Sequence, residues 1–453
     1  MASSLNRDHG ALQESLSLTT SLIDLIEPCQ SLGLNIEAAV HMETANALWE
    51  QGEMTSSIGI LRALDNASFL KAQTISVGRP DLLSKIGHQV SEARLEKPDR
   101  IIERYLKPAL KDLKGSDGYE AAKVFHQFAV FCDQQLQDPD SLEDLERMKK
   151  LSEMRSNDVA DYEELLKNAT SSTERSRHQS YLKKAKTWLG LDEREYRRHC
   201  SNRDEFLRQC LENYLLSLAA SDGHDSNALR FTALWLENSA ENFANEAVAK
   251  VLPKVPSRKF ATLMNQLSSR LLENDSKFQQ HLFGLVLRIC MDHPYHGMYQ
   301  IYAGSHSRPN TKDEVAVSRN KATLKVSEQL QRAESSRAIW TALNYVIQPY
   351  THLAGEKDDQ KYKTGKKLSI KDSPSGLRLN NILKKYPIPP PTIHIDLRAD
   401  KNYSKVPKMV KFESQMSIAS GVSAPKIITA VADNGARFKQ LVSIQNSRFH
   451  YHS

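Results

Sequence analysis

The sequence lacks the features that would place a chain in a membrane, in the secretory pathway or in an oxidising compartment. No apolar run approaches the length of a membrane span. The N-terminus, MASSLNRDHG, has neither the charged region nor the apolar core of a signal peptide, so we do not expect secretion. The five cysteines are scattered, with no Cys-x-x-Cys pair and no histidine pair at metal-binding spacing. We therefore expect free, buried thiols in a reducing compartment and no metal site.

Most of the chain also has no large excess of charge of one sign. The net charge is +6 over 453 residues, but His352–Lys411 alone holds fourteen Lys/Arg against six Asp/Glu. The chain before this segment is slightly acidic and has no basic face to suggest nucleic-acid binding. The basic segment carries enough charge to contact phosphate, yet a solvated, flexible linker explains it more simply.

Helical periodicity is what the sequence has in abundance. From Leu12 to about His352, apolar residues recur at helix spacing. One such stripe is formed by Ala38, Met42, Ala45 and Trp49. Gly52 ends this stripe and a second helical pattern follows, which gives a helix pair of tetratricopeptide type. Such pairs recur without a strict repeat length, so the pattern predicts a degenerate α-solenoid in which each pair packs on its neighbours.

Two details of the helical region can be predicted more closely. Leu229–Leu252 reads as one long helix that ends at Pro253. Val255-Pro256-Ser257 reads as the start of the next helix, with Ser257 as its N-cap.

The pattern changes after His352. Residues 355–376 are rich in Lys, Asp, Gly and Ser, which predicts a poorly ordered loop. The run Pro387-Ile388-Pro389-Pro390-Pro391 cannot be helical. Thr392–Leu397 then alternates like a half-buried strand.

A β-hairpin is predicted near the end of the chain. Asp433-Asn434-Gly435 separates two β-prone runs, 424–432 and 436–442, and Asn-Gly turns need positive φ at both residues. Lys426 and Ile428 stand two residues apart, so their side chains share one face of the sheet. Small residues before a strand that carries a lysine are also how many kinases hold ATP phosphates. Taken alone, an ordinary surface hairpin explains the stretch more simply.

Five segments, in order along the chain, together resemble the ATM-type branch of the phosphatidylinositol-kinase-related protein kinases. They are Leu229-Arg230-Phe231 with Leu234-Trp235-Leu236-Glu237-Asn238, Val255–Phe260 with Leu263–Leu267, Met291–His296, Pro387–Thr392, and Ala419–Val442. The first three resemble the helical FAT domain of that family, the fourth resembles the approach to its kinase domain, and the fifth resembles the first strands of the kinase N-lobe.

The resemblance implies a mainly α protein, a helical-repeat FAT solenoid followed by the β-rich beginning of a kinase N-lobe. Its implied divisions are an α-solenoid over 1–307, a helical continuation over 308–354, a flexible basic linker over 355–386, and a truncated start of the catalytic domain over 387–453. By the same resemblance, the glycine-rich loop and its lysine bind nucleotide. The nucleotide-binding residues are then Met416, Ser417, Ala419, Ser420, Gly421, Val422 and Lys426, with Lys426 on the ATP phosphates.

The resemblance stops after Val442. A family member continues with a lysine, an Asp-Asp-Leu-Arg-Gln-Asp segment and a long helix, whereas this chain continues with residues 443–453, SIQNSRFHYHS. We expect this tail to come from read-through or a mis-joined gene model. No stretch resembles the catalytic loop or the metal-binding Asp-Phe-Gly, so no catalytic residue is assigned, and we expect this chain to be inactive by itself.

The family resemblance implies an ATP-dependent serine/threonine kinase that uses ATP with Mg²⁺ or Mn²⁺ and phosphorylates Ser/Thr-Gln sites, including on histone H2A. It further implies double-strand-break checkpoint signalling, telomere maintenance, a nuclear location, a homodimer, and a DNA-end-sensing nuclease complex reached through other regions. No membrane contact and no sequence-specific nucleic-acid binding are expected. A non-catalytic helical-repeat scaffold is the alternative. His293 and His296, with His281 upstream, could suggest a metal site, but packing at a helix end explains them better.

Overall fold

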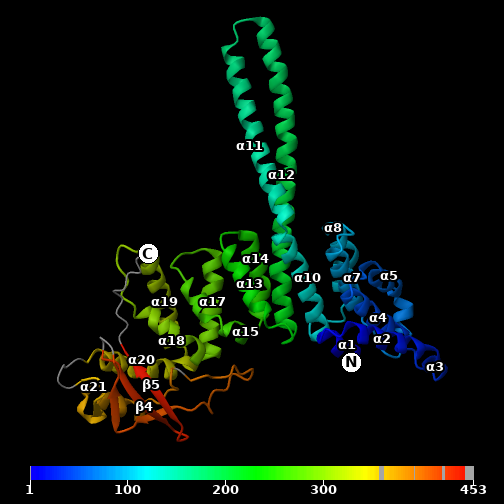
Figure 1. The fold of residues 1–453 in the computed structure, drawn as a ribbon. Coiled ribbons are helices and arrows are strands. Elements are labelled where there is room, and N and C mark those ends of the chain that lie inside the picture. The colour runs from blue at the N-terminus through cyan, green and yellow to red at the C-terminus, as the bar shows by residue number, and fades with distance from the viewer. Residues whose placement is uncertain (1, 357–361, 392, 421–423, 444–453) are drawn as a thin grey trace. The chain divides into compact units, whose positions relative to one another are not determined.

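A computed structural model describes residues 2–356, 362–391, 393–420 and 424–443. The chain divides into two compact units, Met1–Val255 and Pro256–Ser453, each with its own core. The helical array and the small antiparallel sheet that follows it confirm the predicted fold class (Figure 1). No helix in the described ranges has both the length and the apolar character needed to cross a bilayer.

The first unit is all helical. Its helices are α1 (Ala2–Asp8), α2 (Leu12–Asp24), α3 (Ile26–Ser31), α4 (Glu37–Glu50), α5 (Met54–Leu64), α6 (Ala67–Lys71), α7 (Arg79–Glu92), α8 (Pro98–Ile101), the π-helix η1 (Ile102–Leu106), α9 (Lys107–Lys111), α10 (Tyr119–Gln137), α11 (Pro139–Asn168), α12 (Ser172–Ala220), α13 (Asn227–Glu237), α14 (Asn242–Val251) and the 3-10 helix η2 (Leu252–Lys254). The predicted stripe on α4 is buried at Ala38, Met42 and Ala45, and α4 packs on α5 as a helix pair.

α11 and the first part of α12 form a long antiparallel hairpin (Figure 1). No residue of α11 is buried, in contrast to the second half of α12, where Leu211 and Leu215 are fully buried against α10. Charged side chains join the two helices of the hairpin, as in the ion pair between Lys186 and Glu163 at 2.7 Å. The hairpin is therefore a solvated extension of a well-packed helical array.

The predicted long helix over Leu229–Leu252 is wrong, because two helices, α13 and α14, cover this stretch. Polar side chains stabilise the break between them. Asn245 donates from its amide to the carbonyls of Ser239 and Glu241, both at 2.9 Å, and accepts a bond from Trp235 Nε1 at 2.9 Å. Asn245 lies in α14, so apolar periodicity gave no sign of its capping role.

The second unit begins with helices and ends in a sheet. Its elements are α15 (Arg258–Ala261), α16 (Met264–Ser269), α17 (Lys277–Asp292), α18 (Pro294–Ser305), α19 (Glu314–Arg332), α20 (Glu334–Gly355), β1 (Lys367–Ser369), the 3-10 helix η3 (Ile370–Asp372), α21 (Pro374–Lys385), β2 (Met409–Phe412), β3 (Gln415–Ile418), β4 (Lys426–Ala432) and β5 (Arg437–Val442). The predicted capping of the next helix by the Ser257 side chain is wrong. Ser257 precedes α15, but its hydroxyl bonds to Asp292 Oδ2 at 2.6 Å.

β4 is the central strand of the sheet. Along one edge it pairs with β5 over its whole length. Along the other edge its first residues pair with β3 and its last residues with β2, and β1 pairs with β3, all antiparallel. The predicted strand over Thr392–Leu397 is wrong for residues 393–397, which form no regular element, and Thr392 lies outside the described residues.

The predicted hairpin is confirmed, but its turn differs from the predicted type. Gly435 has φ of 81°, whereas Asn434 does not have positive φ. Gly435 N donates to Ala432 O at 3.0 Å and Ala432 N donates to Ala436 O at 2.9 Å. A turn followed by one left-handed glycine therefore joins β4 to β5, which is the three-residue class of hairpin loop.

The expectation of a flexible linker over 355–386 is wrong for residues 367–385. These residues form β1, η3 and α21, with Leu368, Leu379 and Leu383 buried. Ser373 accepts a bond from Gly376 N at 2.9 Å and so caps α21, whose first residue is Pro374. The buried leucines and the Ser373 cap stabilise a stretch whose lysines and glycines are typical of a loop.

Candidate nucleotide-binding site

Lys426 is a fully buried residue at the start of β4, with 0% of its surface exposed. Its ammonium donates to Ala354 O at 3.1 Å and to Glu356 O at 2.6 Å. Both carbonyls stand at the C-terminal end of α20, where the helix dipole favours a cation. The Tyr362 ring lies 5.0 Å from the same nitrogen. Lys426 therefore fastens β4 to the end of α20.

Glu356 holds the same corner of the second unit together. Its carboxylate accepts bonds from Ser373 Oγ at 2.7 Å and Ser375 N at 2.9 Å, and from the Tyr362 hydroxyl. Burial alone would raise the pKa of Glu356, but these hydrogen bonds outweigh it and lower the pKa below its ordinary value. The carboxylate is therefore ionised at neutral pH and links the residues after α20 to the start of α21.

The sheet has an inner face that α20 covers and an outer face. Lys426, Ile428 and Ala430 of β4 are buried on the inner face, which confirms that Lys426 and Ile428 share a face. α20 contacts this face through Tyr350, whose hydroxyl donates to Gln440 Oε1 of β5 at 2.7 Å and whose ring meets Phe412 edge-on at 5.9 Å.

The residues predicted to bind nucleotide are divided between these faces. Met416, which is 2% exposed, lies on the inner face with Lys426, whereas Ser417 pairs with Ile427 and lies on the outer face. Ala419 is half-buried and Ser420 is exposed at the start of the loop. Gly421 and Val422 lie outside the described residues. The structure therefore brings Ser417 and Ser420 to the accessible side and leaves Lys426 on the covered side.

The two ends of the predicted glycine-rich loop are joined by main-chain contacts. Ala419 N donates to Pro425 O at 2.8 Å, which closes the loop at its base. Ala424 has φ of 45°, in the left-handed region that residues with a side chain rarely adopt. A residue held in that region next to a strand is a feature found at ligand-binding turns.

The outer face carries residues that the sequence analysis did not single out. Ile427, Thr429 and Val431 of β4 alternate with the buried positions and are half-buried. Leu441 pairs with Ile427 and Lys439 pairs with Thr429 in β5, and Leu441 is 65% exposed. An apolar side chain that lies next to a hydroxyl and an ammonium group suits a ligand with both a ring and charged groups. The alternation in Arg437–Val442 was the available signal.

No protein-family model matches the chain. The serine/threonine-protein kinase tel1 of Neurospora crassa is 53% identical over 444 residues, which are 98% of this chain and 15% of that protein. A solved structure of the FAT and kinase domain of CtTel1 shares 52% identity and a TM-score of 0.88 over 97% of this chain and 30% of that one. A complete CtTel1 dimer gives the same identity and TM-score over 97% of this chain and 16% of that one. The chain belongs to the Tel1 family of serine/threonine kinases.

The chain spans about 15% of the length of its curated Tel1-family relatives. This membership confirms the resemblance to a FAT domain followed by the beginning of a kinase domain. The role of each predicted nucleotide-binding residue stays a prediction, and so do the implied domain boundaries, although residues 367–385 of the implied flexible linker are ordered. The expectation for residues 443–453 also stays open, because residues 444–453 lie outside the described part of the chain.

The histidines near residue 293 of this Tel1-family segment take part in packing contacts. His293 is buried, and its Nδ1 lies 2.6 Å from the Tyr403 hydroxyl. His296 Nε2 lies 2.8 Å from Ile395 O. Burial lowers the pKa of His293 to about 4, so its ring is neutral at neutral pH. These contacts fix the irregular segment 393–403 against α18.

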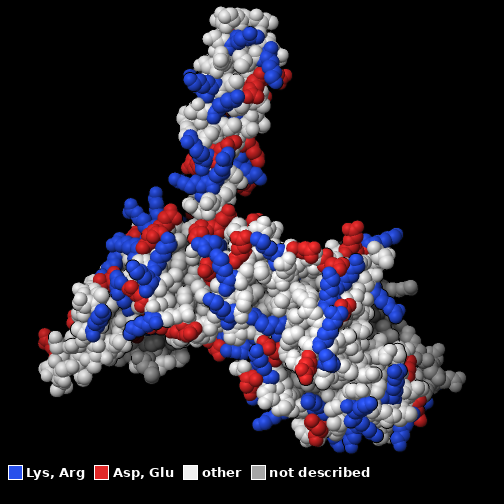
Figure 2. Space-filling model, turned by 180° about the vertical axis from the view of Figure 1, so that it is seen from behind, with Lys and Arg blue, Asp and Glu red and all other residues white. Residues whose placement is uncertain are grey.

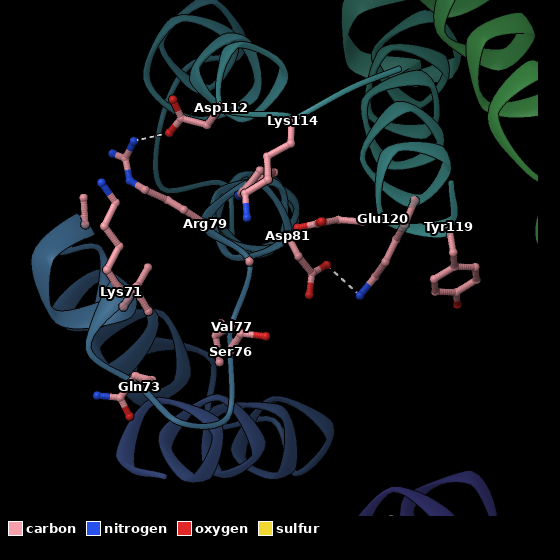
Figure 3. A pocket seen from close by; sticks show the side chains of 15 residues that line it. Lys71, Gln73, Ser76, Val77, Arg79, Asp81, Asp112, Lys114, Tyr119 and Glu120 are labelled. Atoms are coloured by element: carbon pink, nitrogen blue, oxygen red, sulfur yellow. Dashed lines mark hydrogen bonds and ion pairs between the residues drawn. The ribbon is translucent and has the colours of Figure 1, made fainter. Parts of the chain in front are cut away.

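A cavity of about 810 Å³ opens in the first unit, between α6, α7 and α10 (Figure 3). Some of its charged side chains are paired. Arg79 Nε bonds to Asp65 at 2.7 Å and Arg79 also pairs with Asp112, while Lys123 pairs with Asp81 at 2.6 Å. Lys71, Lys114 and Glu120 of the lining form no ion pair with a described residue, so the cavity keeps charges of both signs, and we assign it no function.

Proposed function

We propose that this chain is the part of a Tel1-family kinase that connects the helical FAT array to the nucleotide-binding strands of the catalytic domain. The kinase would transfer the γ-phosphoryl group of ATP to serine or threonine followed by glutamine. The observation that carries the proposal is identity of 53% over 98% of the chain to a protein named as a serine/threonine kinase. The sheet, whose outer face carries an exposed leucine beside polar groups, supports it.

ATP would lie against the outer face of the sheet, with the loop Met416–Val422 at its phosphates. Main-chain N–H groups of such a loop can surround phosphate oxygens. Leu441 and Ile427 would contact the base, and the ammonium of Lys439 points to the same side. The sequence resemblance puts Lys426 on the phosphates, whereas its contacts with Ala354 O and Glu356 O support a positioning role. In that role Lys426 holds the strand that follows the loop.

Mg²⁺ or Mn²⁺ would neutralise phosphate charge when bound. Within the described ranges, no three His, Cys, Asp or Glu side chains gather closely enough to hold a metal ion. The described residues therefore do not fit a metal site, and we assign no metal ligand to them. Their contribution would be to bind and orient the nucleotide.

The wider roles follow from the family and are part of the proposal. We infer phosphorylation of Ser/Thr-Gln sites, including on histone H2A, in double-strand-break signalling and telomere maintenance, and a nuclear location at chromosomes and telomeres. A solved relative described as a complete CtTel1 dimer supports a homodimer for the whole kinase. Contact with a DNA-end-sensing nuclease complex would use regions beyond this segment.

A non-catalytic scaffold is the second candidate function. The burial of Lys426 and the lack of a metal cluster among the described residues both favour it. In that case the helical array would bind partner proteins, and the sheet would only close the end of the second unit. The two candidates differ in whether nucleotide reaches the outer face.

Binding of a fluorescent ATP analogue (mant-ATP) to the purified chain separates these candidates. Leu441→Asp should weaken binding at least about tenfold, because it replaces the apolar contact with the base by a carboxylate that is costly to cover and repels the negatively charged nucleotide. Leu377→Asp is the matched control, since Leu377 is an exposed leucine on α21, 43% exposed, and should leave binding unchanged. Equal affinity for both variants, or no binding by the unmodified chain, would favour the scaffold.

Activity is tested in the longer kinase that contains this segment. Leu441→Asp should raise the KM for ATP in phosphorylation of a Ser-Gln peptide. Lys426→Met should lower the amount of folded enzyme and should leave the KM for ATP of the enzyme that does fold nearly unchanged. A large rise in the KM for ATP with unchanged stability would instead show that Lys426 binds the ATP phosphates.

A further inference from the structure

The basic segment noticed in the sequence is a folded, strongly cationic surface. Between Tyr362 and Tyr386 the chain has seven basic residues against one acidic residue, Asp372. All seven basic side chains are exposed. We call them the basic strip: Lys363, Lys366, Lys367, Lys371, Arg378, Lys384 and Lys385. A flexible linker was the simplest explanation for this charge, and the order of β1, η3 and α21 removes it.

The elements that carry the strip follow one another from Lys367 to Lys385, and η3 packs on α21. Helical spacing puts Arg378, Lys384 and Lys385 on the exposed side of α21, opposite the buried Leu379 and Leu383. α21 packs on β2 through Asn380, whose Oδ1 accepts a bond from Phe412 N at 2.7 Å. Lys411 therefore extends the cationic surface onto the sheet. In Figure 2, basic side chains outnumber acidic ones at the lower right, where the sheet and α21 lie.

Internal contacts do not account for these charges. Among the described residues, none of the seven forms an ion pair, although Lys385 lies over the Tyr386 ring at 5.4 Å. Lys384 and Lys385 stand in the last turn of α21, where cations stabilise a helix. Lys371 stands just before its first turn, where a cation opposes the helix dipole. The stability of α21 therefore explains two of the seven cations and opposes a third.

The surroundings of the strip favour a duplex over a single strand or a protein partner. Tyr362 is buried, and Tyr386 stacks on Tyr345 with ring centroids 4.7 Å apart. No other aromatic residue occurs between them, and Tyr345, which is 50% exposed, already stacks on Tyr386, so the strip offers no series of rings on which successive unpaired bases could stack. α21 has twelve residues and is therefore about 18 Å long, a length that faces about five phosphates of one DNA strand.

We propose that the basic strip binds the phosphate backbone of double-stranded DNA, without reading its sequence. Such contacts release condensed counterions, so affinity falls steeply with salt. The contacts orient the second unit on DNA and need no change in the nucleotide site. The proposal is independent of kinase activity.

Fluorescence anisotropy of a labelled 20-base-pair duplex, titrated with the 453-residue chain at 50 to 200 mM KCl, tests this proposal. The test variant is the triple substitution Lys371→Ala, Arg378→Ala, Lys385→Ala, which leaves out Lys367 because it shares the outer face with Ser417. The control is Arg175→Ala, Lys183→Ala, Lys184→Ala, which removes the same charge from exposed positions of α12. Thermal melting of all three proteins checks that they are folded.

We expect the test variant to bind at least about tenfold more weakly at 100 mM KCl, and the slope of log affinity against log salt to fall by about 2 to 3. The control should keep both the affinity and the slope. Equal losses in the two variants would overturn the proposal, because net charge alone would then explain binding. Tighter binding to polyglutamate than to duplex at equal charge, or no duplex binding at 50 mM KCl, would also overturn it.

Discussion

Each unit buries a charged side chain in its core, and the two units satisfy these charges in different ways. In the first unit, the Asp133 carboxylate on α10 accepts bonds from Arg230 Nε and Nη2, both at 2.6 Å, and from the Tyr214 hydroxyl at 2.9 Å. In the second unit, the Lys426 ammonium donates to two main-chain carbonyls at the end of α20. The first charge is held by side chains from neighbouring helices, and the second contacts the main chain at the end of a helix.

This difference shows what each charge can specify. The partners of Asp133 come from α12 and α13, so its network fixes how three helices pack. Burial alone would raise the pKa of Asp133, but the bonds from Arg230, Gln137 and Tyr214 hold that pKa below its ordinary value. Any residue supplies a carbonyl, so the contacts of Lys426 with Ala354 O and Glu356 O depend on where α20 ends and not on which side chains stand there.

The largest effect is expected at Asp133. Asp133→Ala should destabilise the first unit by roughly 3 to 5 kcal/mol, because it leaves a guanidinium and a buried hydroxyl without their acceptor. Hydrogen exchange followed by mass spectrometry should show faster exchange in α10, α12 and α13, with unchanged exchange in β4 and α20. Exchange that rises equally in both units would show that the two cores unfold together.

A smaller loss of stability is expected when Lys426 is replaced. Lys426→Met keeps the length of the side chain but leaves Ala354 O and Glu356 O without this donor, at a cost of about 2 to 3 kcal/mol. Exchange should increase in β4 and the end of α20. Lys439→Met, on the exposed side of β5, is the control and should change nothing measurable. A similar loss in both variants would mean that Lys426 acts through net charge and not through its buried contacts.

Sequence periodicity was sufficient to predict the helical array, the hairpin, and the shared face of Lys426 and Ile428. It could not show which face of the sheet is covered. Alternation with a period of two divides a strand into two sets of residues, and only the packing of α20 decides which set is buried. The family resemblance placed Lys426 on the ATP phosphates, and the alternation alone does not show that its side chain is fully buried. It contacts carbonyls 70 and 72 residues earlier in the chain, which no local pattern reveals.

Long-range polar contacts explain the other differences. The amide of Asn245 ends a helix that apolar spacing alone would continue. The bond of Ser257 to Asp292, 35 residues away, replaces the predicted helix cap. The polar composition of residues 367–385 predicted a loop, although three leucines there are buried and their spacing is a local signal of order. The outer-face residue Leu441 follows from the alternation of β5, which shows the two faces of the strand but not which of them stays uncovered.

Acid should distinguish the units through His293. Its folded pKa of about 4 lies below the ordinary value of 6.5, so the unfolded state binds the proton more tightly. Stability of the second unit should therefore be constant above pH 6.5 and fall by roughly 1 to 3 kcal/mol between pH 6.5 and 4. His293→Asn should reduce this loss in α18 and residues 393–403 without abolishing it, because burial also lowers the pKa of His296, which contacts Ile395 in the same segment. His126 and His224 shift in the same direction in the first unit, and their effect should survive the substitution.

Asp133 stabilises the first unit in its ionised form, whereas His293 must be neutral, and the stabilisation by Asp133 is lost at a lower pH than that by His293. Its depressed pKa means that the stabilisation is present above the ordinary value of 3.8 and is lost as pH falls below it. Asp133→Asn should remove this acid loss from the first unit and leave the loss between pH 6.5 and 4 in the second. Retention of the loss below pH 3.8 in the variant would assign it to other carboxylates.

The smallest effect is expected where charge is exposed. Lys186 and Glu163 form an ion pair across α11 and α12, with side chains 54% and 44% exposed. Water competes for both groups and salt screens them, so Lys186→Ala should leave hydrogen exchange in the hairpin unchanged at 150 mM salt. If the hairpin exchanges faster in this variant, its charged side chains hold α11 on α12. The hairpin would then resemble the Asp133 network, in which named side-chain partners fix how helices pack.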